Sequence, residues 1–492
     1  MPSIKSLAKD TAIYGVSSIV GRFLNWCLVP LYTIKFPAAE YGIVNYIYSF
    51  TALTLIVLIY GMETGFFRFT SHERYEQDPM RVYSTSLISL AVTSSLFFLA
   101  VMLFIKPVTT LMECTGHEDY VAMMAAVVAI DAFTSIPFSY LRYRKRALRF
   151  ASLKLISIGL NIGLNLWWIL ISPWLLGTEP SLRYIFLSNL ISSGATLLLL
   201  RPELHGFRWR FDSELWRRML SYSWPLLVLG VAGIMNQTLG NILLPHLVPD
   251  KATAMAQLGI YGANQKIAIV MVMFLQAFRF AYEPFIFAQS RERGEDKRRA
   301  YSDAMKYFVI FAMLIFLVVM FYLDILKYFI SPNYFSGLKV VPVIMVAEFF
   351  FGVFFNLSVW YKITDRTVWG MWFSLIGLIV TVVLNILLVP RIGYMGCALA
   401  ALACYGVMML ASYFTGQARY PISYPVGRLT AYFCATLAVW ALTVFISTGH
   451  QWLDMGVRTI ILVICVMAVC RIENINPAAL LRHRKPSIKP NR

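Results

Sequence analysis

The chain has 492 residues, of which 59% are hydrophobic and only 14% charged, and its formal net charge is +18. A soluble protein of this length would carry about 25% charged residues, so the composition leaves almost no room for soluble domains and indicates a polytopic membrane protein. A basic balance can indicate nucleic-acid binding, but here the charge lies in short segments between apolar runs, as in the cytoplasmic loops of membrane proteins.

Apolar runs long enough to cross the ~30 Å hydrocarbon core recur along the whole chain. Because no β-barrel alternation interrupts them, the predicted fold is all-α, with about fourteen transmembrane helices. Most Lys and Arg residues fall in alternate loops when the N-terminus is placed inside, so both termini are predicted to be cytoplasmic. The runs are 11–34, 42–62, 83–105, 120–141, 154–172, 183–200, 219–246, 258–287, 303–322, 338–361, 368–389, 395–415, 427–447 and 453–470.

The first run carries an arginine, Arg22, near its middle. A guanidinium cannot be neutralised at this depth, and its burial in lipid costs roughly 3 kcal/mol or more. Arg22 is therefore expected to face a cationic central cavity that receives the charged head of a lipid-linked substrate.

The segment 201–218, between the sixth and seventh runs, is basic and aromatic. It could form an interfacial amphipathic helix on the inner leaflet, or it could be a plain solvated linker. Short motifs recur in the same order on both sides of it: Tyr41-Gly42 and Phe67-Arg68-Phe69 before it, Tyr261-Gly262 and Phe278-Arg279-Phe280 after it. This order predicts two six-helix bundles at 1–200 and 219–418, joined by the basic linker 201–218 and followed by two helices at 419–472 and a basic cytoplasmic tail at 473–492.

No catalytic or metal-binding motif is evident, so the chain is predicted not to be an enzyme and to hold no metal. Lys266 and Arg279, both in the eighth run, join Arg22 as candidate ligands of an anionic group. Arginine suits phosphate because its planar fork donates two parallel hydrogen bonds. Two alternatives remain open: Lys266 could snorkel to the outer interface, and Arg279 could pair with Glu283 at i, i+4.

Acidic residues within the runs are few. Asp131 is central, and could be a counter-ion to one of the cations or a proton-titrating group. Glu283 and Glu348 are further candidates for these two roles.

The stretch 21–69 resembles the opening of Wzx-type polysaccharide flippases in its Gly-Arg, Pro-Leu-Tyr-Thr, Glu-Tyr-Gly and closing Arg-Phe. The stretch 385–406 resembles the junction of helices eleven and twelve in the same superfamily, called MOP, which includes the lipid II flippase MurJ and the multidrug exporters called MATE. The resemblance implies two six-helix bundles that form a V around a central cavity and work by alternating access. Fourteen spans fit Wzx and MurJ better than MATE.

The resemblance also implies roles for single residues. Arg22 matches a first-span arginine assigned to substrate binding, Arg279 resembles the span-eight arginine, and Arg68 is its counterpart in the first repeat. In MurJ the last two helices make a groove for the lipid tail. Some MurJ proteins use acids to bind sodium between spans seven, eleven and twelve, where this chain offers Asn236, Asn241 and Asn385 and no Asp.

The predicted function is a flippase of the bacterial inner membrane. It would move an undecaprenyl-pyrophosphate-linked oligosaccharide, such as an O-antigen, capsule or exopolysaccharide unit, to the outer leaflet without a cofactor. Coupling to H⁺, Na⁺ or membrane potential stays open. Expected partners are membrane lipids, a polysaccharide polymerase and glycosyltransferases, and not nucleic acid.

Three alternative functions are considered for a chain of this kind. The first is a lipid II flippase of MurJ type, and the second a cation-coupled exporter of MATE type, whose usual cationic cargo disagrees with three intramembrane cations. The third is a membrane polymerase or ligase of glycans, which would typically carry a large outer loop.

Overall fold

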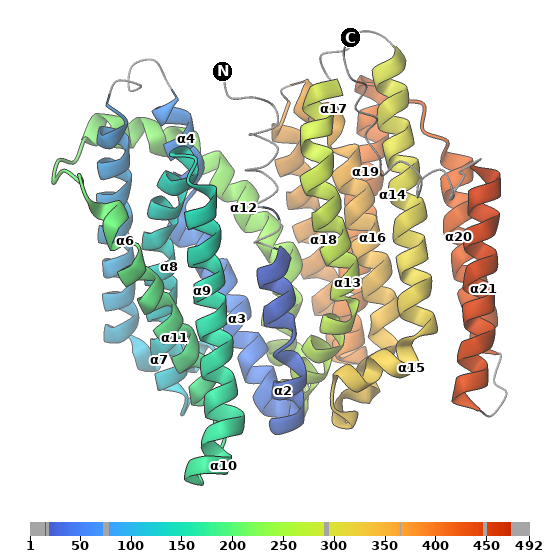
Figure 1. The fold of residues 1–492 in the computed structure, drawn as a ribbon, viewed down its shortest axis with the longest axis horizontal. Coiled ribbons are helices and arrows are strands. Elements are labelled where there is room, and N and C mark those ends of the chain that lie inside the picture. The colour runs from blue at the N-terminus through green and yellow to red at the C-terminus, as the bar shows by residue number, and fades with distance from the viewer. Residues whose placement is uncertain are drawn as a thin grey trace, which may run out of the picture. The chain divides into compact units, whose positions relative to one another are not determined.

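The computed structural model describes residues 15, 19–71, 78–289, 295–364, 366–445 and 450–473, without the side chains of 281, 283–285, 287–289 and 295–297. In these residues every regular element is a helix (Figure 1). Thirteen of the described helical segments are long and apolar enough to cross a membrane. The predicted all-α polytopic fold is confirmed. The first predicted run, 11–34, lies partly outside the described residues and is helical over 19–26.

The chain divides into two compact units. Unit 1 comprises Met1–Phe285 and Phe329–Tyr420, and unit 2 comprises Ile286–Tyr328 and Pro421–Arg492. The predicted grouping of 219–418 into one bundle stays a prediction. The helices of the first part of the chain are α2 Val29–Lys35, α3 Ala38–Ile59, α4 Met62–Thr70, α6 Pro79–Leu103, α7 Ile105–Leu111, α8 Glu118–Tyr143, α9 Ala147–Leu166, η1 Trp167–Ile171, α10 Ser172–Leu176, α11 Leu182–Leu199 and η2 Arg201–Leu204. The later helices are α12 Ser213–Leu247, α13 Lys251–Gln289, α14 Glu295–Phe321, α15 Leu323–Leu326, η3 Lys327–Phe329, η4 Pro332–Val340, α16 Val341–Leu357, α17 Val359–Ile363, α18 Val368–Ile392, α19 Tyr394–Arg419, α20 Val426–Val444 and α21 Gln451–Ile472.

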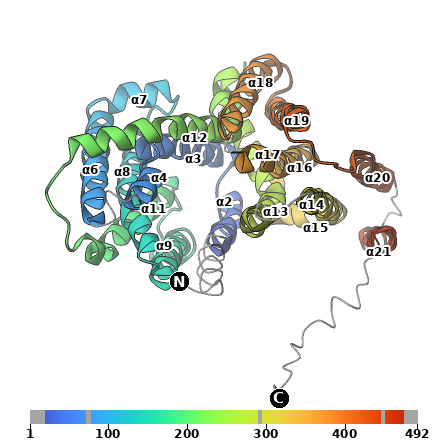
Figure 2. The same ribbon diagram turned by 90° about the horizontal axis from the view of Figure 1, so that it is seen from above.

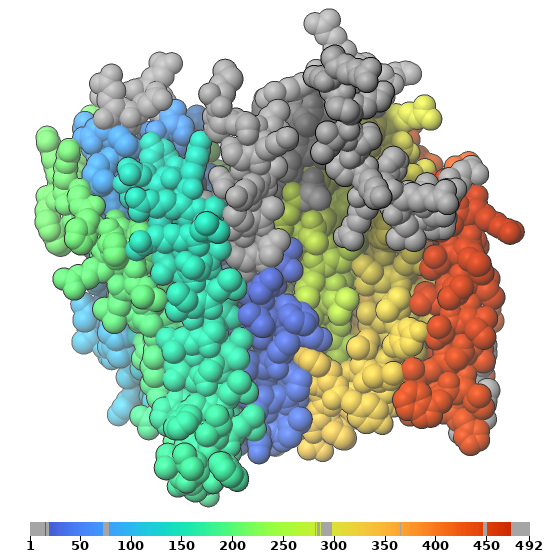
Figure 3. Space-filling view, viewed as in Figure 1, coloured from blue at the N-terminus to red at the C-terminus, as the bar shows by residue number. Residues whose placement is uncertain are grey.

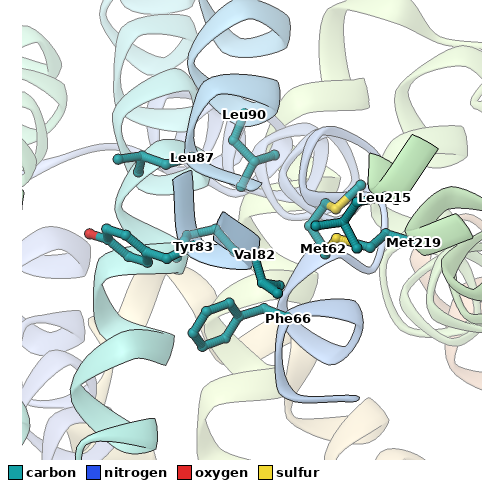
Figure 4. Packing of buried hydrophobic residues seen from close by; sticks show 9 residues of the cluster. Met62, Phe66, Val82, Tyr83, Leu87, Leu90, Leu215 and Met219 are labelled. Atoms are coloured by element: carbon teal, nitrogen blue, oxygen red, sulfur yellow. The ribbon is translucent and has the colours of Figure 1, made fainter. Parts of the chain in front are cut away.

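Within unit 1, α12 packs against helices from both parts of the chain: α3 and α4 before it, α18 and α19 after it (Figure 2). A buried cluster on α4, α6 and α12 fastens it to the first part, with Met62 and Phe66 packed on Tyr83, Leu215 and Met219 (Figure 4). In lipid such helix contacts depend on close packing, because burial from hydrocarbon gives no hydrophobic gain.

The segment between η2 and α12, within the predicted linker 201–218, is not helical. The predicted alternative of an interfacial amphipathic helix is therefore wrong for this segment. Gly206, at φ 84°, turns the chain after η2, and residues 205–212 are not helical. Polar contacts hold them to α6: Arg208 N–H donates to Ser84 Oγ at 3.1 Å, and Arg81 pairs with Asp212. The Asp212 carboxylate then caps α12 by accepting from Leu215 N–H at 3.0 Å. These polar contacts favour the non-helical conformation of 205–212 over a helix.

Unit 2 contains α14, α15, α20 and α21. Two ion pairs tie α21 to this unit's other helices at its opposite ends: Lys306 with Glu473 at 2.7 Å, and Arg458 with Asp324 at 2.8 Å. No residue of α21 is buried in the described structure, as is expected of a helix that faces lipid.

Candidate functional site

The helix that carries Arg22 approaches α9 closely. A Cβ added to Gly21 would lie 2.5 Å from Ile158 Cδ1, so glycine permits this approach. Figure 3 shows the surface of the following helix, α2 (blue), next to that of α9 (teal). On its other side the same helix is tied to α13, because Trp26 Nε1 donates to the Lys266 carbonyl at 2.7 Å. The helix that carries Arg22 thus contacts both α9 and α13, and the Arg22 side chain itself is exposed.

Three predicted cations line one cavity of unit 1, of about 270 Å³, which we call the cationic cavity. Arg22, Lys266 and Arg279 contribute three positive charges, and Glu348 contributes one negative charge. Arg22, Lys266 and Glu348 form no ion pair within 4.0 Å among the described residues. Arg22 and Lys266 thus have no close acidic partner in the described part of the chain, as expected for a wall that meets an anionic ligand.

Half of the other lining residues of the cationic cavity are polar or aromatic, and the other half are aliphatic. Arg279 lies over the Phe355 ring, with 4.4 Å between its Cζ and the ring centroid. Lys266 lies at the cavity wall, half-buried within α13, against the snorkelling alternative. Further polar and aromatic lining residues are Asn236, Gln237, Tyr261, Gln265, Gln276, Phe351 and Tyr405.

The other predicted site residues lie elsewhere. Arg68, on α4, stacks over the Tyr222 ring at 4.5 Å and lines none of the cavities described in this section. Asp131 lines a separate cavity with Lys154. The side chain of Glu283 lies outside the described residues, and with it the proposed pairing with Arg279.

A second cavity of unit 1, of about 400 Å³, shares Arg22 and Lys266 with the cationic cavity. We call it the connecting cavity. Its wall is rich in tyrosines and amides, and Asn189 Nδ2 there donates to the Tyr48 hydroxyl at 2.8 Å. The remaining polar or aromatic lining residues are Asn25, Trp26, Tyr32, Tyr41, Asn45 and Asn161.

A third cavity, of about 420 Å³, is built by α3, α4, α8, α9 and α11 with Asn25, and we call it the neutral cavity. Glu63 and Arg142 form an ion pair at 2.8 Å in its wall, while Asp131 and Lys154 contribute one further charge of each sign. Sequence reasoning missed Lys154, which is the first residue of the predicted run 154–172. Its signal was the polar face of α9, where Lys154, Ser157 and Asn161 recur at i, i+3 and i+7.

The amides offered as a cation site lie in the packing of α12 and α18. Asn236 Nδ2 donates to the Ser374 carbonyl at 3.1 Å, and Asn385 Nδ2 to the Thr381 carbonyl at 2.7 Å. Both Oδ1 atoms are buried and accept no hydrogen bond in the described structure. Two neutral amide oxygens without a carboxylate are a poor match to a hard cation, so we assign them no cation-binding role, although Asn236 also lines the cationic cavity. The described residues contain no group of three or more His, Cys, Asp or Glu that could hold a metal ion.

At one end of unit 1, α3 and α13 cross with their backbones in contact at Gly42 and Gly259, and we call this the α3–α13 crossing. A Cβ added to Gly42 would overlap the Met255 carbonyl oxygen, and one added to Gly259 would overlap that of Ala38. Gly42 belongs to the first of the two repeated Tyr-Gly motifs. Its partner Gly259 does not belong to the second, because it precedes that motif on α13. Only glycine permits this contact.

Polar groups gather beside the crossing. His246 Nε2 lies 2.8 Å from the Tyr46 hydroxyl, and its Nδ1 lies 3.1 Å from Glu113 Oε1. Lys251 Nζ donates to the same Glu113 oxygen at 3.1 Å and to the Pro245 carbonyl at 2.9 Å. This series of polar contacts links α3, the segment after α7, and the α12–α13 junction.

A model of the family described as "Polysaccharide biosynthesis protein" matches residues 7–288. The curated "Lsg locus putative protein 1" of Haemophilus influenzae is 21% identical over 291 residues, which is 58% of this chain and 67% of that protein.

Among solved structures, the lipid II flippase MurJ in its inward closed conformation has a TM-score of 0.73 at 13% identity, over 94% of this chain and 99% of MurJ. An inward-facing MATE family transporter of the MOP superfamily has a TM-score of 0.68 at 14% identity, over 84% of this chain and 95% of its own. These likenesses show the fold. With its family model matched over more than half its length, the chain belongs to the polysaccharide biosynthesis protein family and has the fold of the MOP superfamily.

Proposed function

We propose that the protein is a flippase of the bacterial inner membrane that moves an undecaprenyl-pyrophosphate-linked oligosaccharide to the outer leaflet. One observation carries the proposal: Arg22, Lys266 and Arg279 line a single cavity that holds one acidic side chain. A pyrophosphate cannot cross hydrocarbon unaided, since it would lose its hydration there. The cationic cavity offers it charge-assisted hydrogen bonds in place of water.

The mechanism needs no covalent step. The pyrophosphate binds at Arg22, Lys266 and Arg279 from the cytoplasmic side, while the lipid tail stays in the bilayer. The α3–α13 crossing, at the outer end in the orientation with cytoplasmic termini, then separates as the cavity opens outward. Asp131 and Glu348 are the proposed proton-titrating groups, because each lines a cavity without a close ion pair in the described structure.

The test is complementation of a deletion strain by Arg22→Ala. We expect this variant to abolish surface polysaccharide while its membrane abundance stays normal, because the pyrophosphate loses its central bidentate donor. Arg68→Ala is the matched control, since Arg68 lines none of the three cavities described above. Normal polysaccharide in the Arg22→Ala strain would refute the assignment.

Two substrate alternatives have their own readouts. Rescue of a strain depleted of its lipid II flippase would favour a MurJ-type substrate. Increased drug susceptibility of the deletion strain, with unchanged polysaccharide, would favour a MATE-type exporter.

A further inference from the structure

We propose that the neutral cavity receives the sugar next to the pyrophosphate and selects an uncharged sugar at that position. This inference rests on the proposed function, because it takes the pyrophosphate to bind at Arg22. Four features of unit 1 support it: the adjacency of the cavities, the hydrogen-bonding groups of the wall, the aromatic rings beside them, and the balance of charge.

The neutral cavity adjoins the pyrophosphate site through shared lining residues. It shares Asn25, Asn161 and Asn189 with the connecting cavity, which in turn shares Arg22 with the cationic cavity. Arg22 and Asn25 lie at i, i+3 on one helix, where Cβ atoms are about 5–6 Å apart. A sugar joined directly to a phosphate at Arg22 therefore reaches Asn25 and the cavity beyond it.

The wall carries hydrogen-bonding groups of the kinds that sugar hydroxyls need. Hydroxyls of Ser135, Thr134 and Thr196 donate to carbonyls of their own helices, at 2.7, 3.2 and 2.8 Å, which leaves oxygen lone pairs as acceptors. The amide nitrogens of Asn25 and Asn161 donate to no acceptor in the described part of the chain. A wall with spare donors and acceptors is costly within a membrane unless a polar ligand or water meets it.

Two aromatic rings stand beside these polar groups. Phe138 and Phe150 line the same cavity, with their ring centroids 5.4 Å apart at an interplanar angle of 76°. Apolar or aromatic surface combined with a few placed polar groups is the usual composition of a small-ligand site. It suits a sugar ring, which has apolar C–H faces and a polar edge.

Charge distinguishes this cavity from the cationic one. Glu63 and Arg142 neutralise each other at 2.8 Å. Asp131 and Lys154 line the cavity without approaching within 4.0 Å of each other, and their charges sum to zero. Lys154 Nζ lies over the Phe138 ring, 4.0 Å from its centroid, so it stands beside the proposed sugar position. An acidic sugar would be attracted by Lys154 but repelled by Asp131, and a basic sugar the reverse, so neither gains net attraction to offset its lost hydration. An uncharged sugar carries no such cost.

The test measures dissociation constants by calorimetry on purified protein in detergent, with farnesyl pyrophosphate alone and with glucose or glucuronic acid attached to it. We expect the glucosyl probe to bind more tightly than farnesyl pyrophosphate, and the glucuronosyl probe more weakly than the glucosyl one. Asp131→Asn leaves Lys154 unopposed, so the glucuronosyl-to-glucosyl ratio of affinities should rise at least tenfold. Lys154→Gln should lower that ratio.

Ser152→Ala is the matched control, since Ser152 is exposed on α9 outside the cavity. Because the readout is a ratio of two probes on one protein, partial loss of folding cancels. Equal affinity for all three probes, or a ratio unmoved by both variants, would overturn the sugar assignment. Unchanged binding of farnesyl pyrophosphate in Arg22→Ala would instead overturn the pyrophosphate site on which it rests.

Discussion

The cationic cavity and the α3–α13 crossing differ in whether their charged side chains have ion-pair partners. In the cavity, Arg22 and Lys266 have no ion-pair partner among the described residues. Beside the crossing, Glu113 contacts both His246 and Lys251 at 3.1 Å. An unpaired charge away from bulk water is costly, so a protein retains it where a ligand supplies the partner. The comparison separates groups held ready for a substrate from groups that hold a conformation together.

The crossing depends on contacts that no rotamer change can relieve, and Gly42→Ala tests it most severely. The new Cβ would overlap the Met255 carbonyl oxygen, which is backbone and cannot move alone. We expect α3 and α13 to separate there, with loss of surface polysaccharide in a complemented deletion strain and a lower melting temperature, since overpacking costs about 1–3 kcal/mol.

Gly163→Ala is the control for this prediction. Gly163 lies in α9 with no heavy atom within 4 Å of an added Cβ, so alanine there should be tolerated or slightly stabilising. Full transport by Gly42→Ala would mean that the crossing is not required during turnover.

Lys251→Ala and Arg22→Ala are expected to have opposite effects on stability and on pyrophosphate affinity, so together they test the comparison. Lys251 donates to Glu113 and to the Pro245 and His246 carbonyls, so its loss should cost about 1 kcal/mol of stability and leave pyrophosphate affinity unchanged. Arg22→Ala should do the reverse, with lower affinity for farnesyl pyrophosphate and an unchanged or higher melting temperature. Calorimetric binding and thermal unfolding of both variants measure this, and a marked loss of stability in Arg22→Ala would make Arg22 a structural residue.

The helices, the cations and the glycines were predictable from the sequence to different degrees. The length of an apolar run locates a spanning helix without reference to its neighbours, so the predicted runs agree well with the described helices. Arg22, Lys266 and Arg279 were predictable as a set because a charge within an apolar run needs a polar environment wherever the helices lie. Lys154 was missed, since its place near a helix start is compatible with a loop.

Pairing and close approach were less accessible to sequence reasoning. That Asp131 shares a cavity with Lys154 depends on how α8 faces α9, which a single helix does not encode. The contact of Gly42 with Gly259 depends on a crossing of two helices far apart in the chain. The sequence does not decide between a helix and a linker over 201–218, because the order of this segment comes from partners on α6, such as Ser84 and Arg81.

The smallest effect is expected at Asp212 in the linker. Asp212 forms an ion pair, as the charged groups beside the α3–α13 crossing do. Burial alone would raise the pKa of Asp212, but hydrogen bonds from Leu215 N–H and Arg81, with the charge of Arg81, lower it below its usual value. A carboxyl whose pKa is depressed by folding stabilises the protein above its unfolded pKa of about 3.9, and this contribution is lost as pH falls through the lower folded value. The stability difference between wild type and Asp212→Asn should therefore be constant from pH 7 to 5 and shrink below about pH 4, as measured by thermal unfolding in detergent. A difference that stayed constant to pH 3 would show that Asp212 acts through its shape as a helix cap and not through its charge.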